Sequence, residues 1–320
     1  MSRAASTSVT EDCICRVEGL TKDYGSFRAV DNISFCVRRG EIFGFLGPNG
    51  AGKTTTIRML CGLTKITKGK AIIDGHDLRK EERIVKKLIG VVPDISNLYA
   101  ELSCWDNLIF CGEMYGVPRE ERVKRAEELL KFFGLGRFKN RKFKNLSKGL
   151  KRRLTIAAAL MHSPKILFLD EPTIGLDVLG KRKIWEIINE LNRRGVTIFL
   201  TTHNIYEAFR LCHRIAVINQ GKIVAVGTPN ELKRMVAAQE IVEVSFSPST
   251  PHTEDILSIE GVVSVKVVDN TLRLVVDDAL TALDGIIEYA RHKGLRISML
   301  SLRGADAEEV FLSLVGGKNA

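Results

Sequence analysis

The sequence lacks the features that mark membrane-spanning and secreted proteins. Its longest apolar run, around Ile156 to Met161, is followed closely by His162 and Pro164 and falls short of the ~18–20 residues that a transmembrane helix needs. The opening MSRAASTSVT has no hydrophobic segment behind its arginine, so it does not predict a secretion signal. We therefore expect a globular protein that stays in the cytoplasm.

Cysteine and histidine show no disulfide or metal-ligand pattern. The seven cysteines are odd in number, are scattered, and include no C-x-x-C pair. We therefore expect neither a disulfide framework nor a zinc site, and we interpret most of the cysteines as buried thiols. The six histidines likewise lack the spacing of metal ligands. No internal repeat or low-complexity segment stands out.

Charge is unevenly distributed along the chain, whose net charge is +10. Residues 240–320 include 7 basic and 13 acidic residues, which leaves 41 basic and 25 acidic residues in the part before them. The character of the chain therefore changes near residue 239, and we predict a domain boundary there. A basic front part is compatible with a nucleotide, a nucleic acid or an anionic lipid, and charge alone does not choose among them.

Short apolar runs alternate with helical patterns in the front part. This alternation predicts a mostly parallel β-sheet covered by helices. Strand signals are absent between about 98 and 164, where helical patterns predict a helical subdomain. The predicted strands are 42–46, 71–73, 89–92, 166–169, 197–200 and 215–218, and the helices of the subdomain are 105–115, 119–133 and 148–161.

A different pattern begins after residue 239. Its order, βαββαβ followed by a helix, predicts a small α+β domain of the ferredoxin-like type. We find no catalytic constellation in it. The predicted elements are strand 241–246, helix 252–259, the hairpin of 262–268 and 272–276 with Asp269 and Asn270 at its turn, helix 280–290, strand 297–302 and helix 305–314.

Residues 41–60, EIFGFLGPNGAGKTTTIRML, place a phosphate-binding loop between an apolar strand and a helix. Its glycines allow the backbone to curl close to phosphate oxygens, and the helix start adds the positive end of its dipole. Lys53 is expected to bind the β- and γ-phosphates, and the Thr54 hydroxyl to ligate Mg²⁺. A chance glycine turn would lack this strand–loop–helix setting. The predicted nucleotide-binding residues are Gly47, Pro48, Asn49, Gly50, Ala51, Gly52, Lys53, Thr54 and Thr55.

Two carboxylates end the apolar strand in KILFLDEP at 165–172. We predict that Asp170 holds Mg²⁺ through water and that Glu171 orients or deprotonates an attacking water. His203, after the apolar run 197–200, would contact the γ-phosphate from a third strand end. A strand-to-loop boundary and a structural histidine are the plain alternatives, and the phosphate loop upstream favours the catalytic interpretation.

The stretch NLSKGLKRRL at 145–154 places a serine before a glycine among clustered positive charges. Nine basic and no acidic residues lie within 137–153. Charge alone leaves open a nucleic-acid patch, a membrane-surface helix and a solvated face. Ser147 is well placed to begin a helix, where backbone N–H groups form an anion site.

These segments resemble the ATP-binding subunit of an ABC transporter over about residues 14–235. Six motifs of that family occur here in the family's order, which is far more specific than any one of them. They are GPNGAGKTT at 47–55, VVPD at 91–94, LSKGL at 146–150, LFLDEP at 167–172, GLD at 175–177 and TTHN at 201–204. The LSKGLKRRL variant and the ending ADAEEVFLSLVG resemble the exporter branch that includes drug-resistance and polysaccharide or lipid exporter ATPases.

The resemblance implies an α/β P-loop NTPase core with a helical subdomain, in which each ATP is bound between two subunits. LSKGL stands at the Leu-Ser-Gly-Gly-Gln signature, so Ser147 and Gly149 would contact the γ-phosphate held by the second subunit. Tyr24, in LTKDYGSFRAV, would stack on adenine, and Asp177 would contact the opposite subunit's site. Glu171 corresponds to the general base and His203 to the switch histidine.

Three positions, in two of the motifs, depart from the family's pattern. Lys148 replaces a signature glycine and Leu150 the signature glutamine, while the serine and the second glycine are kept. Asp94 stands where the family has a glutamine that contacts Mg²⁺ or water and relays to the membrane partner. The sequence's two glutamines, Gln220 and Gln239, lie far from this position. The shorter, charged Asp94 remains a candidate Mg²⁺ ligand.

We therefore predict an ATPase that uses ATP and Mg²⁺ to energise export. Its partners would be a second copy or a homologous ATPase subunit and a separate integral membrane permease, docked at helix 105–115 and the loop around Asp94. It would lie in the cytoplasm, peripherally on the inner face of the cell membrane. The predicted parts are a flexible start (1–12), the ATPase domain (13–239) with its helical subdomain (about 98–164), and an accessory domain (240–320).

Three alternative functions fit the sequence less well. A soluble ABC-type ATPase that acts on DNA or ribosomes is favoured by the basic balance alone, and such proteins commonly carry two cassettes or a long coiled-coil insertion, neither of which is present. We therefore do not expect a nucleic-acid partner. A GTP-binding switch would carry an Asn-Lys-x-Asp motif, which the sequence lacks. A purely structural module fits poorly with Lys53, Asp170 and Glu171.

Overall fold

The computed structural model describes residues 12–236, 240–248, 250–269, 271–303, 311 and 314. Contacts divide the chain into two compact units, Met1–Val226 and Gly227–Ala320. This division precedes helix α9 (Pro229–Val236), whereas the sequence placed the boundary after residue 239. The predicted flexible start, apart from Asp12, and the predicted helix 305–314, apart from Phe311 and Leu314, lie outside the described residues.

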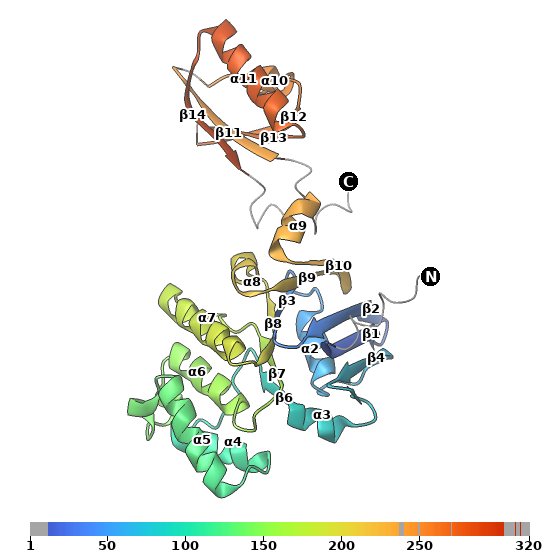
Figure 1. Ribbon diagram of the computed structural model, residues 1–320, viewed down its shortest axis with the longest axis vertical. Coiled ribbons are helices and arrows are strands. Elements are labelled where there is room, and N and C mark those ends of the chain that lie inside the picture. Colours follow the sequence, from blue (N-terminus) through green and yellow to red (C-terminus); the bar gives the residue numbers. More distant parts are fainter. Residues whose placement is uncertain are drawn as a thin grey trace. The chain divides into compact units, whose positions relative to one another are not determined.

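A six-stranded sheet forms the centre of the first unit, in the order β10-β9-β3-β8-β7-β6 (Figure 1). The pairs β6/β7, β7/β8, β3/β8 and β3/β9 are parallel. Three central strands are buried at every position, which is typical of parallel strands covered on both faces. The strands are β3 (Ile42–Leu46), β6 (Ile89–Val92), β7 (Ile166–Asp170), β8 (Thr197–Thr202), β9 (Arg214–Asn219) and β10 (Lys222–Gly227).

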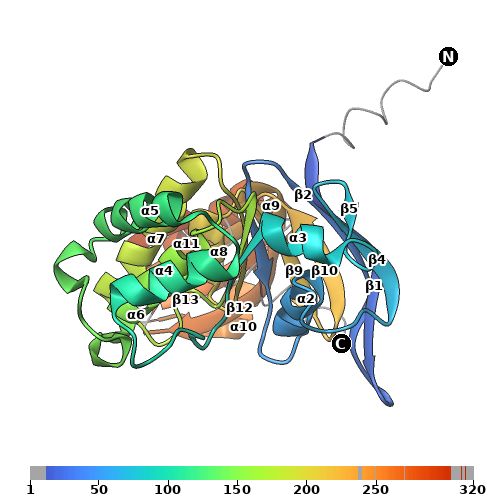
Figure 2. The same cartoon turned by 90° about the horizontal axis from the view of Figure 1, so that it is seen from below.

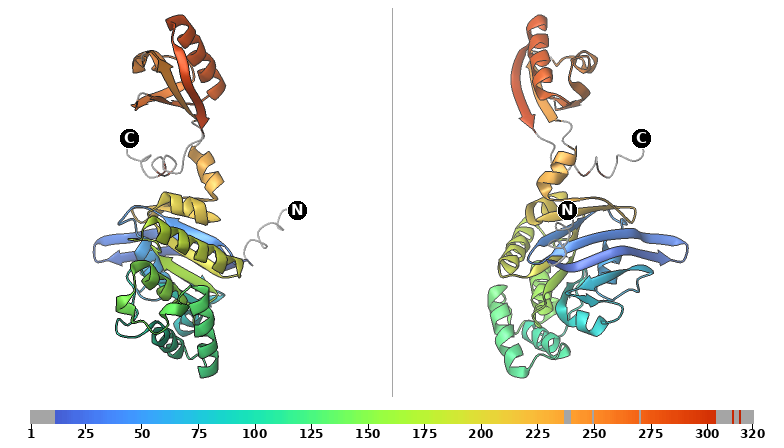
Figure 3. Two further views of the ribbon diagram at one scale, coloured as in Figure 1. Left: turned by 90° about the vertical axis from the view of Figure 1, so that its left-hand side faces the viewer. Right: turned by 45° about the vertical axis from the view of Figure 1, so that its right-hand side comes forward.

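A second, antiparallel sheet has the order β2-β1-β4-β5 and corrects one sequence prediction. The run 71–73 was assigned to the mostly parallel sheet, but it lies in β4 (Lys68–Ile73), which pairs antiparallel with β1 (Cys13–Tyr24). The long strands β1 and β2 (Phe27–Arg38) run side by side (Figure 3) and were not predicted. Their register shifts interrupt the strict alternation of apolar and polar residues that marks a strand. The short β5 (His76–Asp77) completes the sheet.

The same strand pairing corrects the expectation for cysteine. Cys13 on β1 and Cys36 on β2 form a disulfide, although no disulfide framework was expected. Register places Cys13 opposite Arg38, two residues after Cys36, so the hairpin brings together two cysteines that are 23 residues apart. The sequence spacing gave no sign of this contact. The remaining cysteines are free thiols, of which four are buried and Cys111 is partly buried.

Contacts between phenylalanines connect the two sheets near β3, the strand that leads into the phosphate loop. Phe35 on β2 lies 5.6 Å from Phe43 on β3 and 5.9 Å from Phe199 on β8, measured between ring centroids. Phe45 and Phe168 also pack on Phe199. Aromatic pairs at these distances stabilise a core beyond their buried area, so β3 is held firmly up to its end.

Helices surround the central sheet, and three of them form the predicted helical subdomain. The helices α4 (Cys104–Met114), α5 (Arg119–Phe132) and α6 (Lys148–Ala159) pack on one another and lie on the opposite side of this unit from β1, β2 and β4 (Figures 1 and 2). The other helices are α2 (Lys53–Leu60), α3 (Glu82–Leu88), α7 (Val178–Arg193) and α8 (Ile205–Leu211). Two short 3₁₀ segments, Gly136–Phe138 and Phe143–Asn145, lead into α6.

The second unit contains a four-stranded antiparallel sheet in the order β12-β13-β11-β14. Its elements follow the predicted βαββαβ order among the described residues, and the strand order is that of a ferredoxin-like fold. Its core is built from one sheet face, α10 and α11, with Val244, Ile256 and Ile286 fully buried. The elements are β11 (Glu240–Ser247), α10 (Thr253–Leu257), β12 (Val262–Val268), β13 (Thr271–Val276), α11 (Ala279–Lys293) and β14 (Arg296–Arg303).

The predicted fold class is therefore confirmed. Among the residues that the structure describes, no helix combines the length and the apolar character needed to cross a membrane.

Candidate active site

The phosphate loop follows β3 directly, and two of its glycines are required by close backbone contacts. A Cβ atom on Gly47 would lie 2.3 Å from the Ile218 carbonyl oxygen, and one on Gly52 would lie 2.7 Å from the Ala29 carbonyl oxygen. Gly52 also has a φ of 106°, in the region that side-chain-bearing residues rarely adopt, and it caps α2. Only glycine at these positions lets the loop curl against β9 and β2.

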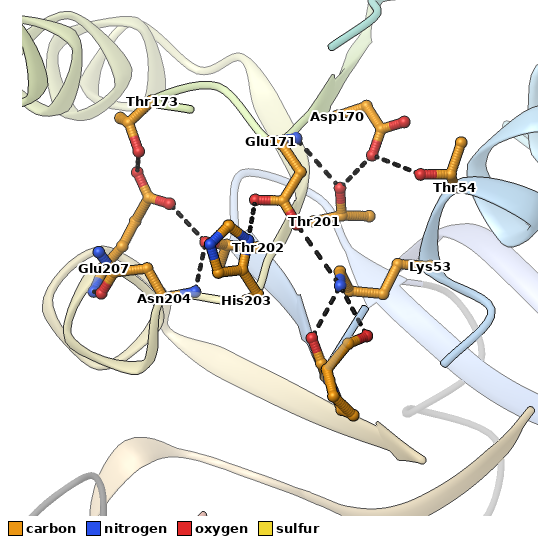
Figure 4. A network of polar contacts seen from close by, with 12 residues as sticks. Lys53, Thr54, Asp170, Glu171, Thr173, Thr201, Thr202, His203, Asn204 and Glu207 are labelled. Atoms are coloured by element: carbon orange, nitrogen blue, oxygen red, sulfur yellow. Dashed lines mark hydrogen bonds and ion pairs between the residues drawn. The ribbon is translucent and has the colours of Figure 1, made fainter. Parts of the chain in front are cut away.

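Lys53 is the first residue of α2, and its side chain is 6% exposed. The Nζ atom donates to the carbonyl oxygens of Gly47 (2.7 Å) and Pro48 (3.0 Å) and lies 3.4 Å from Glu171 Oε1 (Figure 4). Burial lowers the pKa of Lys53, and the Glu171 carboxylate opposes that change. The loop carbonyls and the carboxylate thus compensate for moving the ammonium out of water.

Asp170 ends β7 and faces the start of α2. Its Oδ1 accepts hydrogen bonds from the hydroxyls of Thr201 and of Thr54, the latter at 3.4 Å. Burial raises the pKa of Asp170, while the bonds from Thr201 and Thr54 act in the opposite direction. A carboxylate and a hydroxyl side by side are hard oxygen donors of the kind that Mg²⁺ prefers. Both residues were predicted to hold Mg²⁺.

Glu171, the next residue, has a left-handed backbone conformation with φ 46°. Its N–H donates to the carbonyl oxygen of Thr201 (3.2 Å), and its side chain reaches Lys53 on one side and His203 on the other. His203 Nδ1 lies 2.9 Å from Glu171 Oε2. A non-glycine residue in this conformation persists only where the surroundings hold it, and such positions cluster at functional sites.

The loop that carries His203 is fixed by a buried glutamate that the sequence analysis did not identify. Glu207 on α8 is fully buried and accepts hydrogen bonds from Thr173 (2.7 Å) and Thr202 (2.6 Å) (Figure 4). It also accepts a hydrogen bond from Trp185 Nε1 (2.8 Å). Thr202 immediately precedes His203 and also accepts from the N–H of Asn204. This network therefore fixes the backbone on both sides of the histidine.

Arg152 is a second unpredicted residue of the site. It lies on α6, is 8% exposed, and donates to the carbonyl oxygens of Pro93 (2.6 Å), Asp94 (2.8 Å) and Glu171 (3.3 Å). Burial lowers its pKa, and the nearby carboxylates of Asp94 and Asp170 oppose that change. Nothing in the sequence distinguishes it from the other basic residues of 137–153.

The structure brings together Lys53, Thr54, Asp170, Glu171 and His203, which come from the start of α2 and the ends of β7 and β8 (Figure 4). Each was predicted to belong to one site. Their positions follow from the parallel sheet, because the carboxyl ends of β3, β7 and β8 meet at one edge.

Three other predicted residues lie apart from this cluster. Ser147 caps α6, with its hydroxyl accepting from the N–H of Leu150 at 3.4 Å, and Asp177 caps α7, accepting from the N–H of Gly180 at 2.7 Å. Together with Gly149 they line a surface pocket that includes no residue of the phosphate loop. In one chain, the signature segment therefore does not contribute to the site around Lys53.

Tyr24 and Asp94 are exposed at the surface. Tyr24 ends β1 with 48% of its surface accessible, and Lys22 Nζ lies 4.7 Å from its ring centroid. The Asp94 side chain is exposed, and its backbone carbonyl is held by Arg152. Within the described ranges, no group of three His, Cys, Asp or Glu side chains is arranged to hold a metal by itself.

Comparison with known protein families finds two matches along the chain. Residues 30–174 match the model of the ABC transporter family, and residues 227–315 match that of the C-terminal domain of ATP-binding proteins similar to DrrA1-3. The second match begins at the division between the two units.

Curated relatives cover nearly the whole chain. The linearmycin resistance ATP-binding protein of Bacillus subtilis (strain 168) is 36% identical over 94% of this chain and 98% of its own length. The daunorubicin/doxorubicin resistance ATP-binding protein of Streptomyces peucetius is 38% identical over 93% of this chain and 91% of its own.

Among solved structures, the dimeric post-hydrolysis state of the ATP-binding cassette MJ0796, bound to ADP and Pi, is similar with a TM-score of 0.61. It is 31% identical, and the match covers 67% of this chain and 98% of that one.

Proposed function

Because this chain belongs to the ATP-binding and ATP-hydrolysing subunits of ABC transporters, we propose that two copies, or one copy and a homologous subunit, enclose ATP and Mg²⁺ and drive export through a separate membrane permease. The observation that carries the proposal is the cluster of Lys53, Asp170, Glu171 and His203 around the glycine-lined loop. Relatives that match over more than nine-tenths of the chain and are named for drug resistance support export.

The residues present fit a magnesium-bound triphosphate. The loop's N–H groups and Lys53 would bind the β- and γ-phosphates. Glycine at positions 47 and 52 permits this loop conformation, because a Cβ at either position would collide with backbone atoms. Thr54 and Asp170 would hold Mg²⁺, which supplies charge neutralisation on the phosphate oxygens. Asp94, on the adjacent loop, remains a further candidate for the metal shell. Tyr24 would stack on the adenine ring.

Glu171 is the residue that we assign to proton abstraction from water. Its carboxylate is held between Lys53 and His203, so its orientation is set before water arrives. His203 Nδ1 holds one carboxylate oxygen, and its exposed ring is available to contact the γ-phosphate.

The second subunit would complete the site with its signature segment. Ser147 and Gly149 stand at the exposed start of the 12-residue helix α6, where free N–H groups and the helix dipole favour an anion. Asp177 lines the same pocket. Since these residues lie apart from Lys53 within one chain, a shared site gives them a role that a monomer does not.

A groove on the first unit is suited to the permease. It is lined by apolar side chains, including Leu63, Val91 and Met114, and by the basic residues Arg83 and Lys87. Leu63 is 64% and Met114 70% exposed, so the groove presents apolar surface to solvent. The groove lies between α3, α4 and the segment after β6, where the permease was expected. Docking there would place the protein on the inner face of the membrane.

Exchange of Ser147 for arginine tests the shared site. We expect Ser147→Arg to bind ATP as a monomer with unchanged affinity but to lose ATP-induced dimerisation and hydrolysis, because the long cation fills the position of the partner's phosphate. Gel filtration with ATP, in a Glu171→Gln background that slows turnover, reports the dimer, and phosphate release without that background reports hydrolysis. Ser258→Arg, on the exposed end of α10, serves as the control.

The outcomes separate the parts of the proposal. Absence of magnesium-dependent ATP binding in the unmodified protein would refute nucleotide use itself. Loss of ATP binding together with hydrolysis in Ser147→Arg, or full activity in that variant, would refute a site shared between chains.

A further inference from the structure

Arg152 bridges three segments that are distant in sequence. Strands β6 and β7 are parallel neighbours with Val92 opposite Leu169, so the segments that follow them leave the sheet side by side. Pro93 and Asp94 follow β6, and Glu171 follows β7. The guanidinium of Arg152 reaches from α6 to the carbonyl oxygens of all three residues, with Nη1 on Pro93 and Nη2 on the other two.

These contacts use properties that lysine does not have. A guanidinium presents several N–H donors in a rigid plane and is less strongly hydrated than an ammonium, so it can be buried against several carbonyl oxygens at once. Arg152 is 8% exposed. A lysine at this position would bring a single point charge on a shorter reach, and it would leave part of the carbonyl set without a donor.

The contact to Glu171 falls on a residue whose backbone must be held. Glu171 has φ 46°, and its N–H is fixed by the carbonyl and the hydroxyl of Thr201, both at 3.2 Å. Its carbonyl oxygen is fixed by Arg152 at 3.3 Å. The peptide groups on both sides of the Glu171 Cα are therefore anchored, one by β8 and one by α6, and together they set the direction of the side chain.

We propose that Arg152 is a positioning residue for hydrolysis, which keeps the Glu171 carboxylate in its productive direction by holding the Glu171 carbonyl and the Asp94 loop to the helix that begins at Ser147. This inference rests on the proposed function. It also makes α6 serve two sites of a dimer: its first turn would face the partner's ATP, while Arg152, five residues after the cap, holds the general base of its own chain.

Arg152→Lys tests the assignment, with Arg122→Lys as a matched control. Arg122 is a mostly buried arginine of the same subdomain that pairs with Glu113 and has no contact with the site. We expect Arg152→Lys to lower kcat by ~10²-fold, the scale of a 1 Å misplacement of a catalytic group, while the KM for ATP stays within about threefold. Arg122→Lys should change neither constant by more than about threefold.

A double-variant cycle distinguishes positioning from a general structural role. If Arg152 acts through Glu171, adding Arg152→Lys to Glu171→Gln will not lower the residual turnover further, because the group that it positions is already lost. Multiplied losses in the double variant would overturn the inference, as would wild-type turnover in Arg152→Lys. ATP-induced dimerisation of the double variant confirms that it is folded. Failure of the unmodified protein to dimerise or to hydrolyse ATP would refute the proposed function itself, and not only the role of Arg152.

Discussion

Replacement of Glu171 by glutamine removes proton-accepting ability while keeping the size and shape of the side chain. In the structure the carboxylate makes two contacts, at 3.4 Å to Lys53 Nζ and at 2.9 Å to His203 Nδ1. The amide oxygen of glutamine can keep the contact to Lys53, and its NH₂ group can donate to His203 in the tautomer that leaves Nδ1 unprotonated. Lys53 also keeps its bonds to the loop carbonyls. The variant should therefore fold and bind ATP.

The loss of hydrolysis can be given a magnitude. General-base catalysis contributes ~10²–10⁴-fold, and at 1.36 kcal/mol per factor of ten this corresponds to about 2.7–5.4 kcal/mol of the barrier. We expect phosphate release at saturating ATP and Mg²⁺ to fall by that factor, while the affinity for a fluorescent ATP analogue stays within about threefold. Glu190→Gln, on the surface of α7 where Glu190 pairs with Arg193 and Arg194, provides the control. Turnover within about tenfold of the unmodified protein would remove Glu171 from its assigned role.

Two further predictions concern the framework of the site. Gly47→Ala should abolish ATP binding measured by titration calorimetry, because its Cβ would stand 2.3 Å from the Ile218 carbonyl oxygen and force the loop away from β9. Gly136→Ala, at an exposed position with open space for a Cβ, should bind ATP normally. A Gly47→Ala variant that binds ATP would contradict the importance of this contact. Glu207→Gln should lower the free energy of unfolding, measured by urea denaturation, by about 1–3 kcal/mol, because three buried donors exchange a charged acceptor for a neutral amide. A change below about 0.5 kcal/mol would show that the charge of Glu207 adds no stability.

The phosphate loop and the strand that ends in Asp170 and Glu171 could be predicted because each is encoded within a few consecutive residues. A glycine pattern between an apolar strand and a helix has one well-known geometry, and the parallel sheet then places the other strand ends beside it. The order of elements in the second unit could also be predicted, because each strand and helix there is short and regular.

The features that escaped prediction depend on contacts between distant parts of the chain. Arg152 is one of nine basic residues in 137–153, and its burial arises only when α6 packs over the ends of β6 and β7. Glu207 looks like an ordinary helix glutamate until its three donors, from separate segments, converge on it. Cys13 and Cys36 meet through the register of β1 and β2, which sequence spacing does not reveal.

Pro93 connects the groove to Glu171, the residue that we assign as general base. It lines the groove, and its carbonyl shares the guanidinium of Arg152 with the carbonyl of Glu171. Thermodynamic linkage is reciprocal, so if an occupant of the groove prefers one arrangement of this contact and thereby changes ATP affinity by some factor, ATP must change the affinity for the occupant by the same factor. The affinity for the occupant would then depend on the nucleotide state, and Arg152 would be the residue that couples the groove to the ATP site.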